Sequence, residues 1–493
     1  MDYLDPRKQL EQNVILITGY ILIAISITIA TLVLVYQAYG FGLNQNGTII
    51  QNGLVFFSSQ PNPANIYING KLNPSTTNTR LILLSGGYNV TIAKNGYRDW
   101  SRRIVFDAGA VEHFDYPFLF PKSLTTSQVK QYSSPPALST QSPDRRWILV
   151  EQPGSITNYS LLDLKSPAKP VETTITIPSS ILSKATSGES MQYDEWADDN
   201  QHVLLTHMFD GKTEYILVDR NNPSLSVNLN TVLGTNPSKL SLIDKKYDKY
   251  YVYNTTGGVI ESGSLSGGNI LTPYLQNVLA YESYGSNTML YVTPTNAPTG
   301  KVLLNILEGT QTTTIRQLPV SSSYLVDLTQ YSGTLYVVGG SSSDNRLYIY
   351  QDPASQYQNQ DGIIVPSQVL QIDNPNYVSF SDNAQFIVAE NGTSFAIYDI
   401  ENSKYYSYTT SPALDLPQQH AVWMDGDRLT YIGTNKMIVF DYDGTNQQTL
   451  MSANGGYIPE FSSNYKYVYT FSPLKSENKI ELDRTPLAIP SDL

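Results

Sequence analysis

The chain has 493 residues, with 31 Lys and Arg against 43 Asp and Glu, and a formal net charge of −12. This acidic balance argues against a nucleic-acid-binding protein, which needs clustered positive charge, and the absence of cysteine excludes disulfide scaffolds, Cys-ligated zinc and thiol catalysis. The 37 tyrosines, with 32 Gly and 28 Pro, indicate β structure with many turns, and the length predicts several domains.

An uncharged apolar stretch follows a short polar start. Residues 14–36 read VILITGYILIAISITIATLVLVY, and about 20 such residues span a bilayer as a helix. Arg7 and Lys8 precede the stretch, and the next positive charge is Lys71. The positive-inside rule therefore predicts a single-pass protein of the cell membrane, with residues 1–13 as a cytoplasmic tail and the bulk of the chain outside.

A cleaved signal peptide is the alternative interpretation of the same stretch. Residues 38–40, Ala-Tyr-Gly, would serve as a small-x-small cleavage site. The apolar run of residues 14–36 is longer than the usual signal-peptide core of about 7–15 residues, which favours an uncleaved anchor.

A small β domain is predicted next, after a polar linker over residues 37–51. Short alternating apolar runs occupy residues 54–57, 66–68, 81–84, 88–92 and 103–106. The turn dipeptides between them are Asn69-Gly70, Gly86-Gly87 and Asn95-Gly96. Asn-Gly suits a tight hairpin because both central residues take a positive φ. Strands at this spacing predict a small antiparallel sandwich.

The same region, over about residues 52–121, resembles the PEGA domain. The matching motifs are Pro-Asn-Pro-Ala at 61–64, Ile-Tyr-Ile-Asn-Gly-Lys at 66–71, Gly-Tyr-Asn-Val-Thr-Ile at 87–92, and Gly96-Tyr97 followed by Trp100. The chain departs from the family pattern at Pro63 and Gly86, but both residues still favour turns. The resemblance implies a β-rich interaction or spacer module of a membrane-anchored bacterial envelope protein, with no catalytic residues to carry over.

A loose repeat covers the rest of the chain, after a second linker over residues 122–134. Each unit has a turn rich in small residues, Asp and Asn, then an apolar strand, then a second strand that often ends in Asp. The eight units lie around residues 142–164, 197–219, 243–253, 278–292, 325–350, 380–399, 423–441 and 461–469. Residues 135–493 then contain about 45 residues per unit, as in propeller blades. The sequence predicts an all-β protein with one N-terminal transmembrane helix, ending in a β-propeller of eight blades, or seven if the chain ends share one.

These units resemble Tol-type and WD-like propellers, although the Trp-Asp and Gly-His marks of true WD repeats are missing. Asp441-Tyr-Asp-Gly444, followed by Thr445 and Asn446, is similar to the turn between the third and fourth strands of a Tol-type blade. The apolar pattern lacks a period of 3.6, which excludes a helical solenoid.

Motifs of catalysis are few. The Gly-x-Ser-x-Gly elbow of serine hydrolases is missing, because the glycines four apart, Gly263 and Gly267, enclose Leu265. Residues 211–213, Gly-Lys-Thr, look like the end of a phosphate loop, but Thr206 stands where the first Gly belongs. We expect a hairpin turn there, and no cofactor.

Metal sites are not predicted either. The four histidines are His113, His202, His207 and His420, and none forms a His-Glu-x-x-His motif. His202 and His207 are expected on opposite faces of one strand. Asp441, Asp443 and Asn446 lack the spacing of a calcium loop and favour a turn. A cluster of acidic residues contains Asp194, Glu195, Asp198 and Asp199. We expect it to form a solvated blade turn and not the carboxylate pair of a glycosidase.

The tyrosines offer the remaining candidate contact residues. They concentrate at Tyr251, Tyr253, Tyr405, Tyr406, Tyr465, Tyr467 and Tyr469, with Tyr408 close to the second group. Those that alternate are expected to share one face of a strand. Tyrosine suits both packing between blades and partner contact, and its preference for strands favours packing. A contact role would need these rings to gather on one rim of the propeller.

The expected function is non-catalytic. The anchor, the small β domain and the propeller together predict an extracytoplasmic binding or scaffold protein of the cell envelope, whose propeller recognises a protein or glycan partner. The alternative is a propeller enzyme, a glycosidase or lyase, acting on cell-wall or surface polysaccharide. The alternative requires histidine, tyrosine and acidic side chains to converge in one pocket, and it is weakened if His202, His207 and His420 lie far apart.

Overall fold

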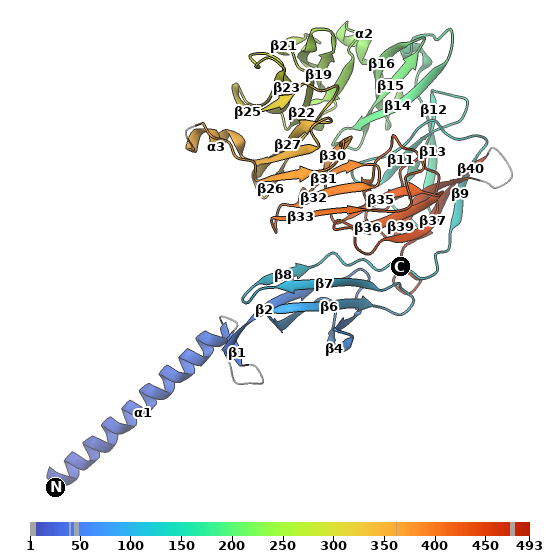
Figure 1. Ribbon diagram of the computed structural model, residues 1–493. Coiled ribbons are helices and arrows are strands. Elements are labelled where there is room, and N and C mark those ends of the chain that lie inside the picture. The colour runs from blue at the N-terminus through green and yellow to red at the C-terminus, as the bar shows by residue number, and fades with distance from the viewer. Residues whose placement is uncertain (1–5, 39–40, 44–48, 361, 474–478) are drawn as a thin grey trace, which may run out of the picture. The chain divides into compact units, whose positions relative to one another are not determined.

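The computed structural model describes residues 6–38, 41–43, 49–360, 362–473 and 479–493 (Figure 1). The chain divides near residue 123 into two compact units, which are treated separately below. Residues 1–5 of the expected tail, and Tyr39 and Gly40 of the alternative cleavage site, lie outside the described residues.

The predicted apolar helix is present as α1 (Pro6–Ala38). Within it, residues 10–36 have a mean hydropathy of 2.3 and are long and apolar enough to cross a membrane. The hydroxyl groups of Thr18, Ser26 and Thr28 each donate to the carbonyl group four residues earlier. These hydrogen bonds satisfy the polar side chains within the helix itself, as a hydrocarbon environment requires.

Two four-stranded sheets form the small β domain. One contains β1 (Phe41–Leu43), β2 (Ile49–Phe57), β5 (Thr79–Leu84) and β8 (Val111–Phe114), and the other contains β4 (Lys71–Thr76), β3 (Asn65–Ile68), β6 (Gly86–Ala93) and β7 (Trp100–Phe106). Val55, Phe57 and Leu81 from the first sheet are buried, as are Ile66 and Trp100 from the second. The predicted sandwich is therefore confirmed, and β8 adds a parallel pair with β2.

Some details of this domain differ from the expectation. The stretch 37–51 is not a plain linker, because α1 continues to Ala38 and β1 pairs with the first residues of β2. Asn69 and Gly70 form the predicted hairpin turn, with φ of 49° and 76°. Gly86 begins β6 instead of forming a turn.

Eight four-stranded sheets make up the second unit, and they are numbered here as sheets 1 to 8. Sheet 1 contains β10 (Ser139–Gln141), β11 (Trp147–Glu151), β12 (Asn158–Asp163) and β13 (Val171–Thr176). Sheet 2 contains β14 (Glu189–Trp196), β15 (His202–Phe209), β16 (Lys212–Asp219) and β17 (Val227–Asn228). Sheet 3 contains β18 (Lys239–Leu242), β19 (Lys249–Asn254), β20 (Val259–Ser264) and β21 (Thr272–Leu275). Sheet 4 contains β22 (Ala280–Tyr284), β23 (Thr288–Thr293), β24 (Lys301–Glu308) and β25 (Gln311–Pro319).

The second half of the unit repeats this arrangement. Sheet 5 contains β26 (Tyr324–Tyr331), β27 (Thr334–Ser341), β28 (Arg346–Gln351) and β29 (Gln368–Gln371). Sheet 6 contains β30 (Tyr377–Phe380), β31 (Phe386–Asn391), β32 (Ser394–Asp399) and β33 (Lys404–Thr409). Sheet 7 contains β34 (Val422–Trp423), β35 (Arg428–Gly433), β36 (Lys436–Asp441) and β37 (Gln448–Ser452). Sheet 8 contains β38 (Glu460–Phe461), β39 (Tyr467–Pro473), β40 (Ile480–Pro486) and β9 (Ser127–Tyr132). Two short helices interrupt the pattern, α2 (Leu229–Leu233) and α3 (Pro353–Asn359).

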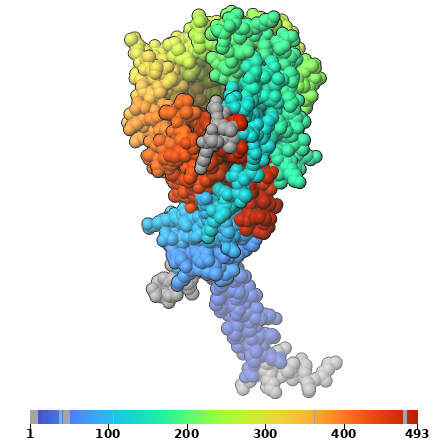
Figure 2. Space-filling model, turned by 90° about the vertical axis from the view of Figure 1, so that its right-hand side faces the viewer, coloured from blue at the N-terminus to red at the C-terminus, as the bar shows by residue number. Residues whose placement is uncertain are grey.

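Strand β9 closes the ring. It comes from the start of the unit but pairs with β40, so that Tyr132 lies opposite Ile480. Sheet 8 then packs on sheet 1 through a shared core that includes Ile148, Leu162 and Tyr469, and the cyan and red segments lie side by side in Figure 2. The eight predicted units correspond to the eight sheets of a closed β-propeller. The stretch 122–134, expected as a linker, contains β9, which is the fourth strand of sheet 8.

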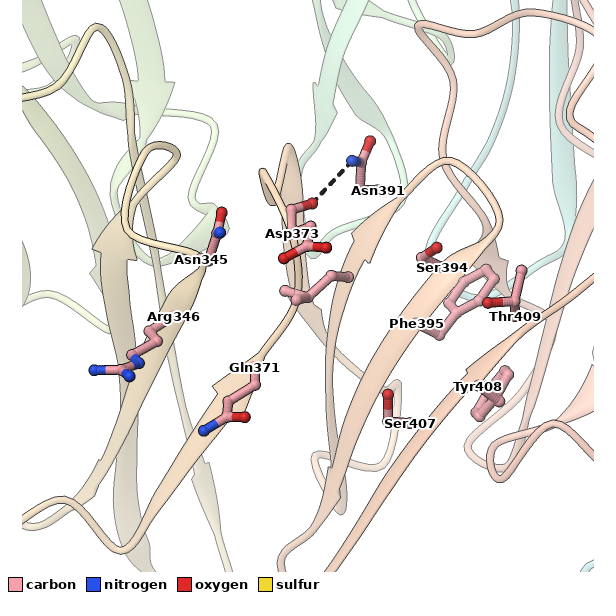
Figure 3. Close-up of a pocket in the computed structure, with 11 residues that line it drawn as sticks. Asn345, Arg346, Gln371, Asp373, Asn391, Ser394, Phe395, Ser407, Tyr408 and Thr409 are labelled. Carbon is pink, nitrogen blue, oxygen red and sulfur yellow. Dashed lines mark hydrogen bonds between the residues drawn. The ribbon is translucent and has the colours of Figure 1, made fainter.

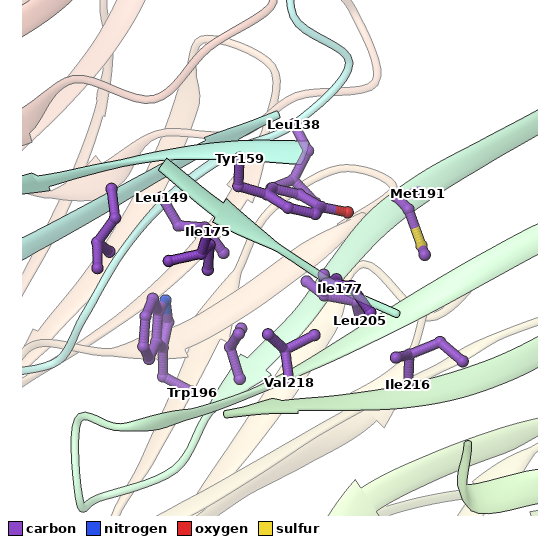
Figure 4. Close-up of a cluster of buried hydrophobic side chains, with 12 residues drawn as sticks. Leu138, Leu149, Tyr159, Ile175, Ile177, Met191, Trp196, Leu205, Ile216 and Val218 are labelled. Atoms are coloured by element: carbon purple, nitrogen blue, oxygen red, sulfur yellow. The ribbon is translucent and has the colours of Figure 1, made fainter. Parts of the chain in front are cut away.

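Strand alternation builds the propeller core between neighbouring sheets. In β11, Leu149 packs toward sheet 2 with Trp196 and Val218 (Figure 4), while Ile148 packs toward sheet 8. In each central strand successive side chains point to opposite faces, and both faces are covered by a neighbouring sheet. This explains why these strands read as continuous apolar runs in the sequence.

Candidate functional site

The first strands of the sheets form the inner ring of the propeller. Trp196 Nε1 of sheet 2 donates to Thr140 of sheet 1, and the carboxylate of Glu195 accepts from the backbone N–H of Leu242 in sheet 3. On the other side of the ring, Asp327 of sheet 5 accepts from the backbone N–H of Phe380 in sheet 6. The side chains nearest the axis are thus used largely to connect sheet to sheet.

Arg145 crosses one end of this ring. It lies in the turn between β10 and β11, and its Nη2 donates to Asp382 of sheet 6 at 2.6 Å. Its guanidinium also lies 4.9 Å from the ring centroid of Tyr465 in sheet 8. The turns between first and second strands therefore converge at the same end of the propeller axis.

Asp and Asn in these turns stabilise the turns themselves. The residues that accept a hydrogen bond from the backbone N–H two positions later are Asp144, Asp199, Asn383, Asp425 and Asn464. In sheet 1, Arg146 then donates two hydrogen bonds to Asp163 at the end of the third strand. Much of the repeated Asp and Asn is explained by this local geometry.

The acidic cluster predicted for a solvated turn is divided. Asp198 and Asp199 do lie in the turn, but Asp194 and Glu195 belong to β14. Asp194 hydrogen-bonds to Thr206, and burial raises its pKa to about 6. The expectation failed for Asp194 and Glu195 because the first strand extends to Trp196 before it turns.

The calcium-like segment of sheet 7 is a turn, as predicted. Asn446 Nδ2 donates to Asp441 at 2.8 Å, and the hydroxyl of Thr445 donates to Asp443 at 2.6 Å. Within the described ranges, no group of three or more His, Asp or Glu side chains is arranged to hold a metal ion.

The histidines do not converge. His202 and His207 lie on opposite faces of β15, as predicted: His202 stacks on Tyr247 of sheet 3, while His207 is fully buried and contacts Glu214. His420 lies before β34 and stacks on Tyr377 of sheet 6, and burial lowers its pKa. The three imidazole rings thus pack in three separate places and do not face one shared pocket.

The candidate contact tyrosines are also separated. Tyr251, Tyr253 and Tyr469 are buried in the cores between sheets, where they pack as the strand preference of tyrosine favours and leave little surface for a partner. Tyr465 has a φ of 55° and belongs to the turn before β39, so it does not share a strand face with Tyr467.

The other contact candidates lie nearer the surface. Tyr467 is half-buried against the core between sheets 8 and 1. Tyr406 packs edge-on against Tyr442 of sheet 7. Tyr405 is 38% exposed, and its hydroxyl donates to the carbonyl of Gln371 in sheet 5. Tyr405 is therefore the candidate tyrosine that lies beside an open cleft.

That cleft is a groove of about 420 Å³ between sheets 5 and 6 (Figure 3). The residues lining it are Asn345, Arg346, Gln371, Ile372, Asp373, Asn391, Ser394, Phe395, Ser407, Tyr408 and Thr409. They come from the outer strands and from the turns at the end where second strands meet third strands. We call it the sheet 5–6 groove.

Two lining residues of the sheet 5–6 groove, Phe395 and Tyr408, turn their rings to the other face of sheet 6, where both pack against Phe440 of sheet 7. Phe395 stacks on Tyr408 with centroids 5.4 Å apart, and the Tyr408 hydroxyl donates to the carbonyl of Tyr442. Gly444 lies so close that an added Cβ would be 2.6 Å from the Tyr408 ring. Gly444, in the segment that resembles a Tol-type turn, thus holds the Tyr408 ring in place.

Unused polar side chains line the rim of the sheet 5–6 groove. In the part of the chain that the structure describes, the side chains of Arg346, Gln371, Asp373, Ser407 and Thr409 have no hydrogen-bond or ion-pair partner. The side chains of Arg346 and Gln371 point away from sheet 6 (Figure 3), so the groups that face the groove are those of Asp373, Ser407 and Thr409, and the two hydroxyl groups can both donate and accept. The groove therefore offers two hydroxyl groups and one carboxylate for hydrogen bonds to a ligand.

A second cavity, of about 700 Å³, lies at the same end of the propeller beside sheet 2. It is lined by Ser183, Lys184, Phe209, Lys212, Thr213, Glu214, Asn230, Asn236 and Pro237. Asp210 and Gly211 make the predicted hairpin turn between β15 and β16, with φ of 48° and 71°. We call this cavity the sheet 2 pocket.

Sequence reasoning missed both cavities. Each takes residues from segments that are distant in the chain, and most of these residues are single Asn, Ser, Thr or Lys without a motif. The one sequence signal is the Gly-Lys-Thr tripeptide of residues 211–213, which predicts a hairpin turn. The turn is present at Asp210 and Gly211, and Lys212 and Thr213 directly after it line the sheet 2 pocket.

Comparisons with known proteins gave one family match and several distantly similar structures. Residues 52–119 match the family model of the PEGA domain. Similar solved structures include the Dos1 propeller, at 12% identity and a TM-score of 0.42 over 74% of this chain and 96% of that chain. An oligogalacturonate lyase in complex with manganese has 13% identity and a TM-score of 0.38 over 74% of this chain and 99% of that one. Hsv2p of Kluyveromyces lactis has 10% identity and a TM-score of 0.40 over 64% and 98%.

No function follows from similarities as distant as these, and no curated protein matches the chain. The family match and the closed ring of sheets do establish the architecture. The chain carries an apolar N-terminal helix, a PEGA domain over residues 52–119 and an eight-bladed β-propeller.

Proposed function

We propose that this protein is a membrane-anchored, extracytoplasmic recognition or scaffold protein of the cell envelope. Helix α1 would be the uncleaved anchor, with Arg7 and Lys8 on the cytoplasmic side. The PEGA domain would act as a spacer, and the propeller would bind a protein or glycan partner without chemical change.

The observation that carries the proposal is the sheet 5–6 groove. The polar side chains of Asp373, Ser407 and Thr409 line it, and among the residues that the structure describes they have no hydrogen-bond or ion-pair partner. A concave site with a few unpaired hydrogen-bonding groups can fix the orientation of a bound sugar or peptide segment. Tyr405 extends the same surface at the edge of sheet 6.

The alternative is an enzyme acting on cell-wall or surface polysaccharide. It would need acid and base groups that face one substrate. The separate environments of His202, His207 and His420 weigh against it, and the groove has Asp373 as its one carboxylate. Binding without catalysis is therefore the function that this geometry supports best.

Site-specific photo-crosslinking in cells tests the proposal. A photoreactive amino acid at Ser407, in the groove, should yield discrete crosslinked species from the full-length protein. The same amino acid at Thr173 is a matched control, because Thr173 is also an exposed residue on the outer strand of a sheet but lies outside the groove. Equal crosslinking at both positions, or none at Ser407, would contradict a recognition role for the groove.

A further inference from the structure

One wall of the sheet 2 pocket is fixed by two carboxylates, the buried Glu214 and the exposed Asp210. Glu214 at its base accepts hydrogen bonds from the backbone N–H and hydroxyl of Ser183, at 2.8 and 2.7 Å. It also accepts from Asn228 at 2.8 Å and contacts His207 Nδ1 at 2.9 Å. Four contacts from three residues occupy this carboxylate and leave it no free acceptor site toward the cavity.

A second carboxylate holds the same wall. Asp210 accepts hydrogen bonds from the backbone N–H and hydroxyl groups of Thr186 and Ser187. The segment that connects sheet 1 to sheet 2 is thereby fixed on the β15–β16 hairpin at both Ser183 and Ser187. The pocket is therefore formed before any ligand binds, which reduces the entropic cost of binding.

The two carboxylates lie in surroundings that favour negative charge. Hydrogen bonds from Thr186 and Ser187 lower the pKa of Asp210 to about 2. Burial acts to raise the pKa of Glu214, but its hydrogen bonds to His207, Ser183 and Asn228 lower it overall. Both shifts have the same cause, an excess of hydrogen-bond donors around the pocket.

The cations of the pocket, in contrast, are unused. Among the residues that the structure describes, the ammonium groups of Lys184 and Lys212 have no ion-pair or hydrogen-bond partner. Both side chains are exposed at the cavity. Asn236 and Thr213 add polar groups, and the Phe209 ring, stacked on His207 at 4.9 Å, adds an aromatic wall.

We propose that the sheet 2 pocket binds a carboxylated saccharide. The two lysines would hold carboxylate groups through charge-assisted hydrogen bonds, the amide and hydroxyl groups would bind sugar hydroxyls, and the Phe209 ring would contact a sugar face. A cavity of about 700 Å³ is large enough for more than a single small anion. The inference rests on the proposed function, for which it names a ligand class and a second site apart from the sheet 5–6 groove.

Binding of a defined oligosaccharide to the full-length protein in mild detergent tests the inference. The probe is a tetrasaccharide of glucuronic acid, compared by calorimetry with the neutral tetrasaccharide of glucose and with inorganic phosphate. We expect the acidic tetrasaccharide to bind, with the Lys184→Ala/Lys212→Ala double variant weakening it at least tenfold. Lys184→Arg/Lys212→Arg should retain most of the affinity, because arginine keeps the charge.

The matched control is the Lys165→Ala/Lys169→Ala double variant, which removes two exposed lysines from the β12–β13 turn. It should bind like the unaltered protein. Equal affinity for the neutral tetrasaccharide, unchanged affinity in the Lys184/Lys212 double variant, or phosphate competing as well as the tetrasaccharide would each overturn the inference.

The outcome separates this inference from the proposed function. An Arg346→Ala/Asp373→Ala variant alters only the sheet 5–6 groove, so it should still bind the acidic tetrasaccharide. A protein that crosslinks a partner at Ser407 but does not bind the acidic tetrasaccharide would overturn the inference alone. Binding of the acidic tetrasaccharide without crosslinking would overturn the role proposed for the groove.

Discussion

Arg428 donates two hydrogen bonds to the carboxylate of Asp425, from Nε at 3.0 Å and from Nη2 at 2.8 Å. Both side chains are almost fully buried at the start of β35, and Arg428 also lies 3.8 Å from Asp441 at the end of β36. The arginine thus joins the turn before the second strand to the end of the third strand. Removing one partner of such a buried pair costs far more stability than the intact pair contributes.

We expect Arg428→Met to lower the free energy of unfolding by about 3–5 kcal/mol, because it leaves Asp425 and Asp441 buried without their cation. The midpoint of chemical denaturation measures this change in the full-length protein in detergent. Arg346→Met is the control, since Arg346 is exposed, and it should change stability by less than about 0.5 kcal/mol. Equal effects of the two substitutions would show that the Arg428 contacts are not structural.

Closure of the propeller by β9 gives a second prediction. Gln131 lies opposite Glu481 of β40. A Gln131→Pro substitution puts a ring where the strand needs a regular backbone, and should expose sheet 8 to local opening, while Gln131→Ala should not. Hydrogen exchange of the β40 amides should be faster in the proline variant alone. Unchanged exchange would mean that β9 is dispensable for closure.

Buried carboxyl groups predict how stability depends on pH. Burial raises the pKa of Glu390 to about 8, well above its ordinary value of 4.5, even though Ala421 N–H donates to the carboxylate. The folded protein then retains a proton that the unfolded chain releases, so this group reduces stability as the pH rises from about 4.5 to about 8. The change amounts to about 1.4 kcal/mol for each unit of pKa shift.

A Glu390→Gln substitution removes the group that loses its proton on unfolding, and its amide oxygen still accepts the hydrogen bond from the Ala421 N–H. As the pH is raised from 5 to 8, the denaturant concentration at the unfolding midpoint should decrease for the unaltered protein. It should decrease less for the glutamine variant. Glu460 has a pKa raised by burial to about 8 as well, so Glu460→Gln should act in the same direction. A midpoint that rises with pH in this range, or an equal fall in both variants and the unaltered protein, would contradict the assignment.

The proposed topology predicts exposure of the propeller on the outer side of the membrane. Protease added to intact spheroplasts should degrade residues after the anchor and leave a short membrane-bound fragment. Full protection of the propeller in intact spheroplasts, with degradation only after lysis, would reverse the orientation expected from Arg7 and Lys8.

The repeat was predictable because its cause is local. Each turn with Asp or Asn stabilises itself through its own backbone, and each apolar run fills the space between two sheets, so both features recur in the sequence at the blade period. Asp144 with Arg146, and Asn383 with Gln385, show this at the same place in two sheets. The hairpin at Asn69-Gly70 was predictable for the same reason.

The closing strand and the cavities were not predictable, because long-range contacts define them. Nothing in residues 127–132 specifies that they pair with a strand about 350 residues later. Packing is the favoured role of the tyrosines and describes Tyr251 and Tyr469, but alternation alone does not show which tyrosines reach the surface, since both faces of a blade strand are covered. The sheet 2 pocket combines Lys184 and Lys212 only after a connection between sheets folds onto a hairpin.

The most direct test of recognition by the propeller is retention of the full-length, detergent-solubilised protein on immobilised cell-wall glycan and on envelope proteins at physiological salt. The account predicts that the unaltered protein is retained on at least one of them, and that Arg346→Ala/Asp373→Ala in the sheet 5–6 groove reduces retention there. Retention on neither would contradict recognition by the propeller, and equal retention of the unaltered protein and the groove variant would contradict the role proposed for the sheet 5–6 groove.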